Sequence, residues 1–300
     1  MQKANDIHVL LGISFLLMSV FFAPLFCITY AQERFRIPEI STPKTEKMVD
    51  VGGRKLHGCF YGEGSPAVIL VSGHGATQTY WNPVIPDLAA QTTVVTFDRA
   101  GNGKSEINDL PTHGLQSAKD LHSILEKMDV PKPYILIGHS YGGDVVRLFA
   151  SLYPDDMGGM ILEDAQHEAV LDEQRKILKG RDLEILEEMA ARFSPPENPE
   201  TEGDYRNITI EQLKNNQRLP EIPFVVLTAG NRSQAMPPVF SEEAKAKIAK
   251  LGVELQKKVV TLIPGGKHII VDGVGHNIHL EKPDALIGPV IDMISNARNK

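Results

Sequence analysis

A serine at position 140 stands in a sequence that favours nucleophilic chemistry. It occurs in GHSYG at 138–142, directly after the apolar run YILI and just before the helical pattern DVVRLF. A serine hydroxyl becomes a useful nucleophile when it stands clear of the backbone and a nearby base takes its proton. Gly138 and Gly142 carry no side chains that would clash across a sharp strand-to-helix turn, which is the arrangement that exposes such a hydroxyl. Ser140 is therefore the candidate nucleophile.

Two acids and a histidine follow Ser140 in an order suited to acyl transfer. Glu163 and Asp164 end one apolar run, and His276 follows a later one. In a doubly wound sheet, groups at the carboxyl ends of the strands gather on one rim. We therefore expect His276 to act as base on Ser140 and an acid to orient the imidazole. Successive side chains on a strand face opposite ways, so we expect only one of the two acids to face the histidine.

Backbone amides are expected to stabilise the negative charge that develops on a substrate oxygen. Ser140 would lie at the N-terminus of the helix predicted at 142–153, so the Tyr141 N–H would point toward that charge. The loop after the strand predicted at 67–73 would supply a second donor, and we assign it to the Ala76 N–H.

The elements that must position these groups are a parallel sheet and its covering helices. Most apolar runs are continuous rather than alternating, which is typical of strands covered on both faces. Strands are predicted at 55–62, 67–73, 93–98, 134–138, 159–165, 223–230 and 267–273. Helices are predicted at 81–90, 116–129, 142–153, 242–262 and 283–297. This alternation predicts an α/β fold with a doubly wound, mostly parallel sheet.

One interval, 166–221, interrupts the alternation. It contains no convincing strand, and its amphipathic helical pattern at 168–193 is followed by the loop sequence SPPENPETEGD. We interpret it as a helical insertion into a core formed by 47–165 and 222–300. An apolar stripe at helical spacing either roofs a binding pocket or packs on the core, and both alternatives stay open. The stripe consists of Leu186, Met189, Ala190 and Phe193.

Residues 1–31 are predicted to direct the chain out of the cytoplasm. The segment 9–31 is an almost uninterrupted apolar run whose end fits a small-x-small cleavage site, and Pro24 also favours a cleaved signal peptide. The run is long enough to span a bilayer as one helix, so an N-terminal membrane anchor is the alternative. A polar linker at 32–46 follows. Either alternative predicts an extracytoplasmic chain, secreted, periplasmic or anchored at the membrane.

The composition excludes several kinds of partner and cofactor. The formal net charge is −7 and there is no basic run, so we expect neither nucleic-acid binding nor attraction to an anionic membrane. Without residues 1–31, Cys59 is the sole cysteine, and its apolar neighbours predict a small buried side chain. With no paired cysteines and no HExxH spacing, the sequence shows no zinc signature. Catalysis by a serine, a histidine and an acid needs no metal and no organic cofactor, so none is expected.

The chain resembles proteins of the α/β-hydrolase fold over nearly its whole length after the linker. The matching segments are VSGHGATQTYW (71–81), FDRAGNGKS (97–105), GHSYGG (138–143), LEDA (162–165) and GVGHNIHLEKPD (273–284). The resemblance implies hydrolysis of a small-molecule acyl substrate through an acyl-enzyme, with Ser140 as nucleophile and His276 as base. It implies oxyanion donors in the backbones of Ala76 and Tyr141, and a cap over the site at 166–221. Ser140 disfavours the relatives that use an aspartate nucleophile, such as epoxide hydrolases.

The position of the acid departs from the family pattern. The family's acid commonly follows the strand equivalent to 223–230 in a Gly-x-x-Asp pattern, but this sequence reads GNRS at 230–233. A minority of the family places the acid one strand earlier. The resemblance therefore favours Asp164, which precedes an alanine as in the related pattern, with Glu163 as the alternate acid.

The motifs leave the scissile bond open. Cleavage of a carboxylic ester or related acyl bond is predicted, and hydrolysis of a C–C bond or an amide on the same triad is an alternative. A non-catalytic receptor that binds a small ligand in the same pocket is another. A membrane-anchored scaffold is a third, and it depends only on 9–31.

Other polar residues near the rim are interpreted as structural. His74 and His139 are expected to fix loops, and Asp98 to organise the turn that it begins. In the family, residues equivalent to His279 and Glu281 help to seat the final helix.

Overall fold

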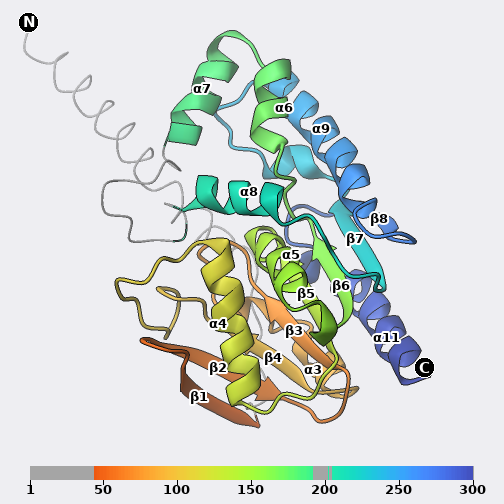
Figure 1. The fold of residues 1–300 in the computed structure, drawn as a ribbon. Coiled ribbons are helices and arrows are strands. Elements are labelled where there is room, and N and C mark those ends of the chain that lie inside the picture. Colours follow the sequence, from red (N-terminus) through yellow and green to blue (C-terminus); the bar gives the residue numbers. More distant parts are fainter. Residues whose placement is uncertain (1–43, 192–201, 203–204, 300) are drawn as a thin grey trace, which may run out of the picture. The chain divides into compact units, whose positions relative to one another are not determined.

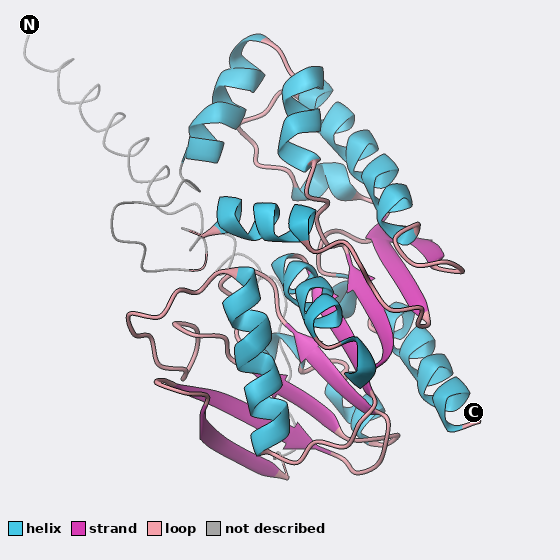
Figure 2. Cartoon of the chain, viewed as in Figure 1, coloured by secondary structure: helices cyan, strands magenta, loops and turns pink. Residues whose placement is uncertain are grey.

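The computed structural model describes residues 44–191, 202 and 205–299, whose strands form one sheet. The strand order is β1-β2-β4-β3-β5-β6-β7-β8 (Figures 1 and 2). The pairs β1/β2 and β2/β4 are antiparallel, and all other neighbouring strands are parallel. The strands are β1 (Thr45–Asp50), β2 (Lys55–Tyr61), β3 (Ala67–Val71), β4 (Val94–Phe97), β5 (Tyr134–His139), β6 (Met157–Glu163), β7 (Phe224–Ala229) and β8 (Lys267–Val271). The predicted α/β class with a mostly parallel sheet is confirmed.

Helices cover both faces of the sheet, and each face has its own apolar core. The helices around the sheet are η1 (Gln78–Trp81), α3 (Ile85–Ala89), α4 (Gly114–Lys127), α5 (Tyr141–Leu152), η2 (Pro154–Asp156), η3 (Arg232–Ala235), α9 (Glu242–Val260), α10 (Ile278–Glu281) and α11 (Asp284–Arg298). Side chains of α4, α5 and α9 share one core with Ile69 and Leu136. Those of α3 and α11 share the other with Leu70, Ile135 and the buried Cys59. Because consecutive residues of β3 and β5 enter opposite cores, these strands have continuous apolar sequences.

The two edge strands depart from the sequence pattern. β1 begins at Thr45, inside the segment 32–46 that the sequence analysis assigns to a linker, and only Val49 of this strand is buried. An antiparallel edge strand with one buried residue carries no apolar run, so the pattern missed it. β8 is predicted as a covered strand, but at the other edge it leaves Ile269 37% and Ile270 45% exposed.

Three helices lie between β6 and β7 in the sequence: α6 (Val170–Ile177), α7 (Gly180–Ala191) and α8 (Arg206–Asn215). α8 packs against α4 and α5, whereas α6 packs against α9 (Figure 1). Leu186 of α7 belongs to a small separate core that includes Phe240 and Ile248. Of the predicted apolar stripe, Leu186 therefore packs inside this core, and Phe193 lies outside the described residues.

The predicted targeting segment 9–31 and residues 32–43 of the linker also lie outside the described residues. Among the helices that the structure does describe, none has both the length and the apolar character needed to cross a bilayer. The roles assigned to residues 1–31 stay predictions.

The turn from β5 into α5 holds Ser140 in a conformation that few side chains adopt. Ser140 has φ 51° and ψ −120°, which lies on the left-handed side of the backbone map. A Cβ on Gly138 would lie 2.5 Å from the Gly142 carbonyl oxygen. A Cβ on Gly142 would lie 2.1 Å from the Val71 carbonyl oxygen. Glycine is required at both positions because the turn brings backbone directly against backbone.

Gly142→Ala should therefore lower the free energy of unfolding by about 3 kcal/mol, since the new methyl group must push two backbone segments apart. Gly288→Ala is the matched control, because Gly288 is exposed on α11 and no atom lies within 4 Å of the place that its Cβ would occupy. Pro289 follows it in the helix and disfavours the helical conformation of a preceding residue with a Cβ, which offsets the gain in helix propensity, so this control should change the free energy of unfolding by less than about 1 kcal/mol. Urea unfolding followed by circular dichroism measures both. Equal midpoints for Gly142→Ala and the wild type would contradict the steric account.

Candidate active site

The loops after β6 and β8 bring an acid and a histidine into contact. Nδ1 of His276 lies 2.7 Å from Oδ2 of Asp164. The Asp164 side chain is 3% exposed and that of His276 is 35% exposed, so the acid is buried and the ring reaches solvent. A carboxylate accepts a hydrogen bond from Nδ1–H, which leaves Nε2 with a lone pair. His276 is thus held in the tautomer that a general base requires.

The two neighbouring acids face different histidines. Oε1 of Glu163 accepts hydrogen bonds from the backbone N–H and Nδ1–H of His279, at 2.9 and 2.7 Å. Asp164 leaves the strand with φ 43° and donates its own N–H to the Leu227 carbonyl at 2.8 Å. Opposite sides of the chain therefore carry the two carboxylates, and Asp164 is the acid in contact with His276.

The loop that carries His276 lies directly against the residue before Ser140. Nε2–H of His139 donates to the His276 carbonyl at 3.1 Å, and the two ring centroids lie 4.6 Å apart. Burial, and then the neighbouring rings of His276 and His279, lower the pKa of His139 well below its ordinary value, so its ring is neutral. Among the described residues, the half-buried Ser140 makes no hydrogen bond from its hydroxyl to the His276 ring.

The two amides predicted to bind an oxyanion have different surroundings. Tyr141 is the first residue of α5, so its N–H has no carbonyl one turn earlier to bond within the helix. The Ala76 N–H donates to the Gly73 carbonyl at 3.2 Å and so closes a turn. The Gly75 N–H donates to Oε1 of Glu202 at 2.6 Å. A ligand at Ala76 would therefore have to replace a long turn bond, whereas the Tyr141 amide has no such bond to break.

A buried ion pair supports the loop that contains Ala76. Nε and Nη2 of Arg99 donate to the two carboxylate oxygens of Glu202 at 2.7 and 2.8 Å, and Nη2 also donates to the Gly73 carbonyl at 2.7 Å. Burial alone would raise the pKa of Glu202, but Arg99 beside it keeps that pKa below its ordinary value. The guanidinium carbon lies 5.4 Å from the centroid of the Tyr141 ring. Sequence reasoning missed Glu202, because its segment has only loop composition.

A second charged residue that sequence reasoning missed is Arg232. Its Nη1 donates to Oδ1 of Asp164, which also accepts the Ala229 N–H at 3.1 Å. The Gly-x-x-Asp pattern would place the acid at Ser233, but within the described ranges no hydrogen bond joins the side chain of Ser233 or of Asn231 to His276. The departure at GNRS is the one sequence signal that could have directed attention to Arg232.

His139, Glu163 and His279 form a buried group whose possible ligand atoms all lie within 4.8 Å of one another. Oε1 of Glu163 and Nδ1 of His279 bond to each other, whereas Nδ1 of His139, Oε2 of Glu163 and Nε2 of His279 are buried and have no hydrogen-bond partner within the described residues. The Trp81 ring centroid lies 4.4 Å from that of His279 and closes the group on one side. The group packs against Trp81 on one side and, through Nε2–H of His139, bonds to the His276 carbonyl on the other.

Two other acids bond to backbone in the loops around the site. Asp98 accepts the Gln78 N–H at 2.8 Å and the Lys104 N–H at 3.1 Å. Glu281 accepts the Gly275 N–H at 2.8 Å. Both contacts fix loop backbone and neither involves Ser140 or His276.

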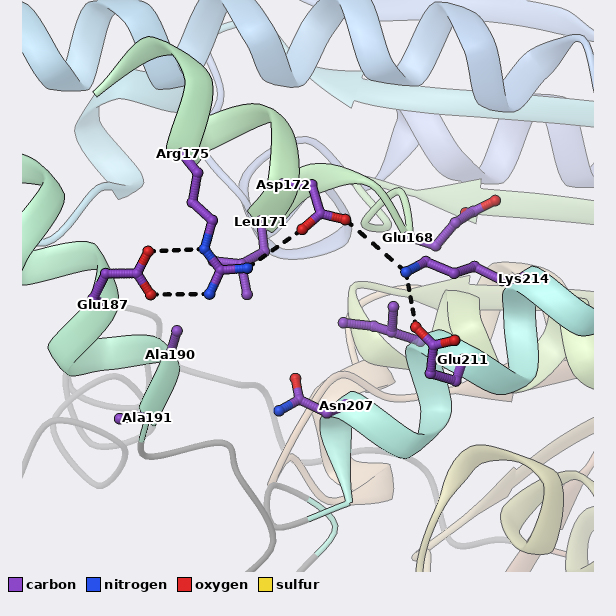
Figure 3. A pocket seen from close by; sticks show the side chains of 11 residues that line it. Glu168, Leu171, Asp172, Arg175, Glu187, Ala190, Ala191, Asn207, Glu211 and Lys214 are labelled. Carbon is purple, nitrogen blue, oxygen red and sulfur yellow. Dashed lines mark hydrogen bonds and ion pairs between the residues drawn. The ribbon is translucent and has the colours of Figure 1, made fainter. Parts of the chain in front are cut away.

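The insertion contains a cavity of about 360 Å³ (Figure 3). Its charged side chains are paired with one another: Arg175 with Glu187 at 2.8 Å, and Lys214 with Glu211 at 2.8 Å. The cavity is lined by Glu168, Leu171, Asp172, Arg175, Glu187, Ala190, Ala191, Asn207, Ile210, Glu211 and Lys214. Neither Ser140 nor His276 lines it, so this cavity is separate from the site on the sheet rim.

Comparison with known proteins agrees with this architecture. The family profile described as alpha/beta hydrolase fold matches residues 66–209. The protein YqjL of Bacillus subtilis (strain 168) is 28% identical over 247 residues, which cover 79% of this chain and 87% of YqjL.

Two solved structures share the fold at lower sequence identity. A thermophilic esterase from Thermogutta terrifontis is 19% identical with a TM-score of 0.60, and the match covers 86% of this chain and 99% of the esterase. A bromoperoxidase from Bacillus anthracis is 16% identical with a TM-score of 0.60, and the match covers 84% of this chain and 100% of the bromoperoxidase. The strand order, the turn at Ser140 and these matches lead to one conclusion: the chain has the α/β-hydrolase fold, and its residues 66–209 match the profile of that family.

Proposed function

We propose that this chain is a serine hydrolase that cleaves a carboxylic ester, or a related acyl bond, of a small molecule. The observation that carries the proposal is the 2.7 Å contact between Asp164 and His276, beside a serine on a strained strand-to-helix turn. An acid that fixes the tautomer of a histidine near a serine hydroxyl is the arrangement needed to activate that hydroxyl. The fold shared with an esterase supports the same reaction class.

In the proposed first step, Nε2 of His276 takes the proton of Ser140 while Oγ attacks the substrate carbonyl carbon. These two atoms must come within hydrogen-bond reach of each other, and such catalytic hydrogen bonds often form only when substrate binds. The carbonyl oxygen becomes negatively charged and is stabilised by the Tyr141 and Ala76 amides. His276 then gives its proton to the leaving alcohol, and the acyl group stays on Ser140.

In the proposed second step, His276 takes a proton from water, and the hydroxide attacks the acyl carbonyl. Collapse of that intermediate returns the proton from His276 to Ser140 and releases the carboxylic acid. Asp164 stays ionised and stabilises the imidazolium in both steps. The side chains of this scheme supply all its proton transfers, so it uses no cofactor.

We also infer that the insertion acts as a cap over this site. Three contacts support this role. Thr209 of α8 accepts the Gly114 N–H at 2.9 Å and lies 3.4 Å from the Tyr141 hydroxyl, and Glu202 accepts the Gly75 N–H at 2.6 Å. One of these contacts reaches Tyr141, which follows Ser140, and another reaches the loop of Gly75, whose Gly73 lies next to Ser140, so the insertion meets the region where a cap would select the substrate.

Ser140→Ala should lower kcat/KM for p-nitrophenyl esters by about 10⁵-fold, because the nucleophile and its covalent intermediate are lost. A panel of acyl chain lengths measures this and also gives the preferred acyl group. Ser295→Ala, at an exposed position of α11, is the matched control and should hydrolyse like the wild type. Hydrolysis by Ser140→Ala at the wild-type rate would refute the proposal. A wild-type chain that a fluorophosphonate fails to label at Ser140 would instead indicate a binding protein.

Substitution of the two acids should distinguish their roles. Asp164→Asn should lower kcat by about 10⁴-fold, because the amide cannot stabilise an imidazolium. Glu163→Gln should lower kcat by less than about tenfold and mainly lower the thermal midpoint, since it weakens a buried bond to His279. Ester kinetics and thermal melts of both variants measure the difference. The reverse ranking of the two kcat values would show that the acid is misassigned.

The location of the chain is a separate proposal, based on residues 1–31. Expressed in a bacterial host, the full chain should leave the cytoplasm, and mass spectrometry of its N-terminus should show cleavage before Gln32. Retention of the uncleaved chain in the membrane fraction would favour the anchor alternative. Deletion of residues 1–31 is the control and should leave the protein in the cytoplasm. An uncleaved full chain in the cytoplasm would contradict both.

A further inference from the structure

The two carboxylate oxygens of Asp164 bond to different partners. Oδ2 faces Nδ1 of His276 at 2.7 Å, while Oδ1 accepts the Ala229 N–H at 3.1 Å and a hydrogen bond from Nη1 of Arg232. A carboxylate held at both oxygens cannot rotate about its terminal bond without breaking one set of contacts. The orientation of the His276 ring therefore depends on the groups that hold Oδ1.

Arg232 is itself fixed by the surface on which it lies. Its side chain is 12% exposed, and its Nε lies 2.7 Å from the place that a Cβ on Gly252 would occupy. Gly252 lies in the middle of α9, and its lack of a side chain leaves the space that the guanidinium occupies. The side chain thus runs between η3 and α9 and ends on Asp164. This is a defined path rather than a loose surface contact.

The pair joins a buried anion to a nearly buried cation. Burying an unpaired carboxylate is costly, and a partner with good geometry offsets that cost. In this structure the cation contacts the oxygen that His276 does not use. It therefore compensates the buried charge and leaves the other oxygen available to the ring.

We propose that Arg232 is a positioning residue for the reaction described under Proposed function, on which this inference rests. Its guanidinium holds Oδ1 of Asp164 so that Oδ2 stays on Nδ1 of His276. It touches neither the candidate nucleophile nor the ring, and it acts through the acid.

The charged and titratable groups around His276 determine how this role is tested. Asp164 contacts its ring, and Arg232 lies behind that acid. His139 stands beside the ring, at a centroid distance of 4.6 Å, and is neutral. Glu281 accepts a hydrogen bond from the N–H of Gly275, the residue before His276. His279 and Glu163, which bond to each other, are the other two titratable groups named for this site. Replacing Arg232 removes one positive charge behind Asp164 and leaves the other groups around His276 unchanged.

The test measures how fast a fluorophosphonate labels Ser140 as pH is varied. Arg232→Gln should slow labelling at pH 7 by roughly tenfold to a hundredfold, the size of effect found for partners that orient a ligand or base. It should also move the acid limb of the profile to higher pH by roughly one unit, because the imidazolium loses a repelling cation nearby. Arg232→Lys keeps the positive charge but replaces the planar guanidinium, with its several N–H donors, by a single ammonium group. Its labelling rate should therefore lie between those of the wild type and Arg232→Gln.

A matched control removes an arginine from the other end of the parallel strands. Arg298 of α11 donates to the carbonyls of Ser65 and Gln91, at the amino ends of the strands, so Arg298→Gln should label like the wild type. In an Asp164→Asn background, replacing Arg232 should have little further effect, because the group that it positions is gone.

Several outcomes would overturn the inference. Arg232→Gln with the wild-type rate and profile would show that Asp164 needs no such partner. A lower thermal midpoint with an unmoved acid limb in both Arg232 variants would show a purely structural role. Additive losses in the double variant would show that Arg232 acts elsewhere. If the wild-type chain itself is not labelled, the proposed function fails, and this inference fails with it. That result differs from the others, because in each of them the wild type is labelled.

Discussion

The contact between Asp164 and His276 requires two strand ends that are not neighbours to meet. β7 lies between β6 and β8 in the sheet, so the acid and the ring must reach each other past the end of β7. Ala229 ends that strand with a methyl side chain, and its N–H bonds Asp164 at 3.1 Å. A Cβ on the next residue, Gly230, would lie 2.9 Å from the Cα of Asp272. Small residues at the end of β7 therefore let the two sides of the site come together.

Buried charges around the site occur in pairs that also bond to backbone. Asp164 pairs with Arg232 and accepts an amide, while Arg99 pairs with Glu202 and bonds a loop carbonyl. Such pairs contribute little net stability, because desolvation offsets most of their attraction. Their effect is geometric, since a charge that leaves its partner inside the protein meets a large penalty. Each pair therefore holds a loop in one arrangement.

The features predictable from the sequence are those that the sequence encodes locally. The continuous runs of β3 and β5 and the glycines around Ser140 appear within a few residues, and so the sheet and its sharp turn could be predicted. Arg232 and Glu202 could not, because their partners lie 68 and 103 residues away and no periodicity connects them. β1 was hidden because only Val49 of that strand is buried. Pairing between distant charges depends on the completed fold.

His276 follows an edge strand of the sheet, and this position affects how activity would be lost on heating. The residue follows β8, which pairs with β7 alone and leaves Ile269 and Ile270 partly exposed. Strands at a sheet border with few buried contacts open locally more readily than central ones. Ser140 follows β5, whose six residues are all buried. On heating, the imidazole would therefore leave its place while the serine stayed fixed, and inactivation would precede melting of the central strands.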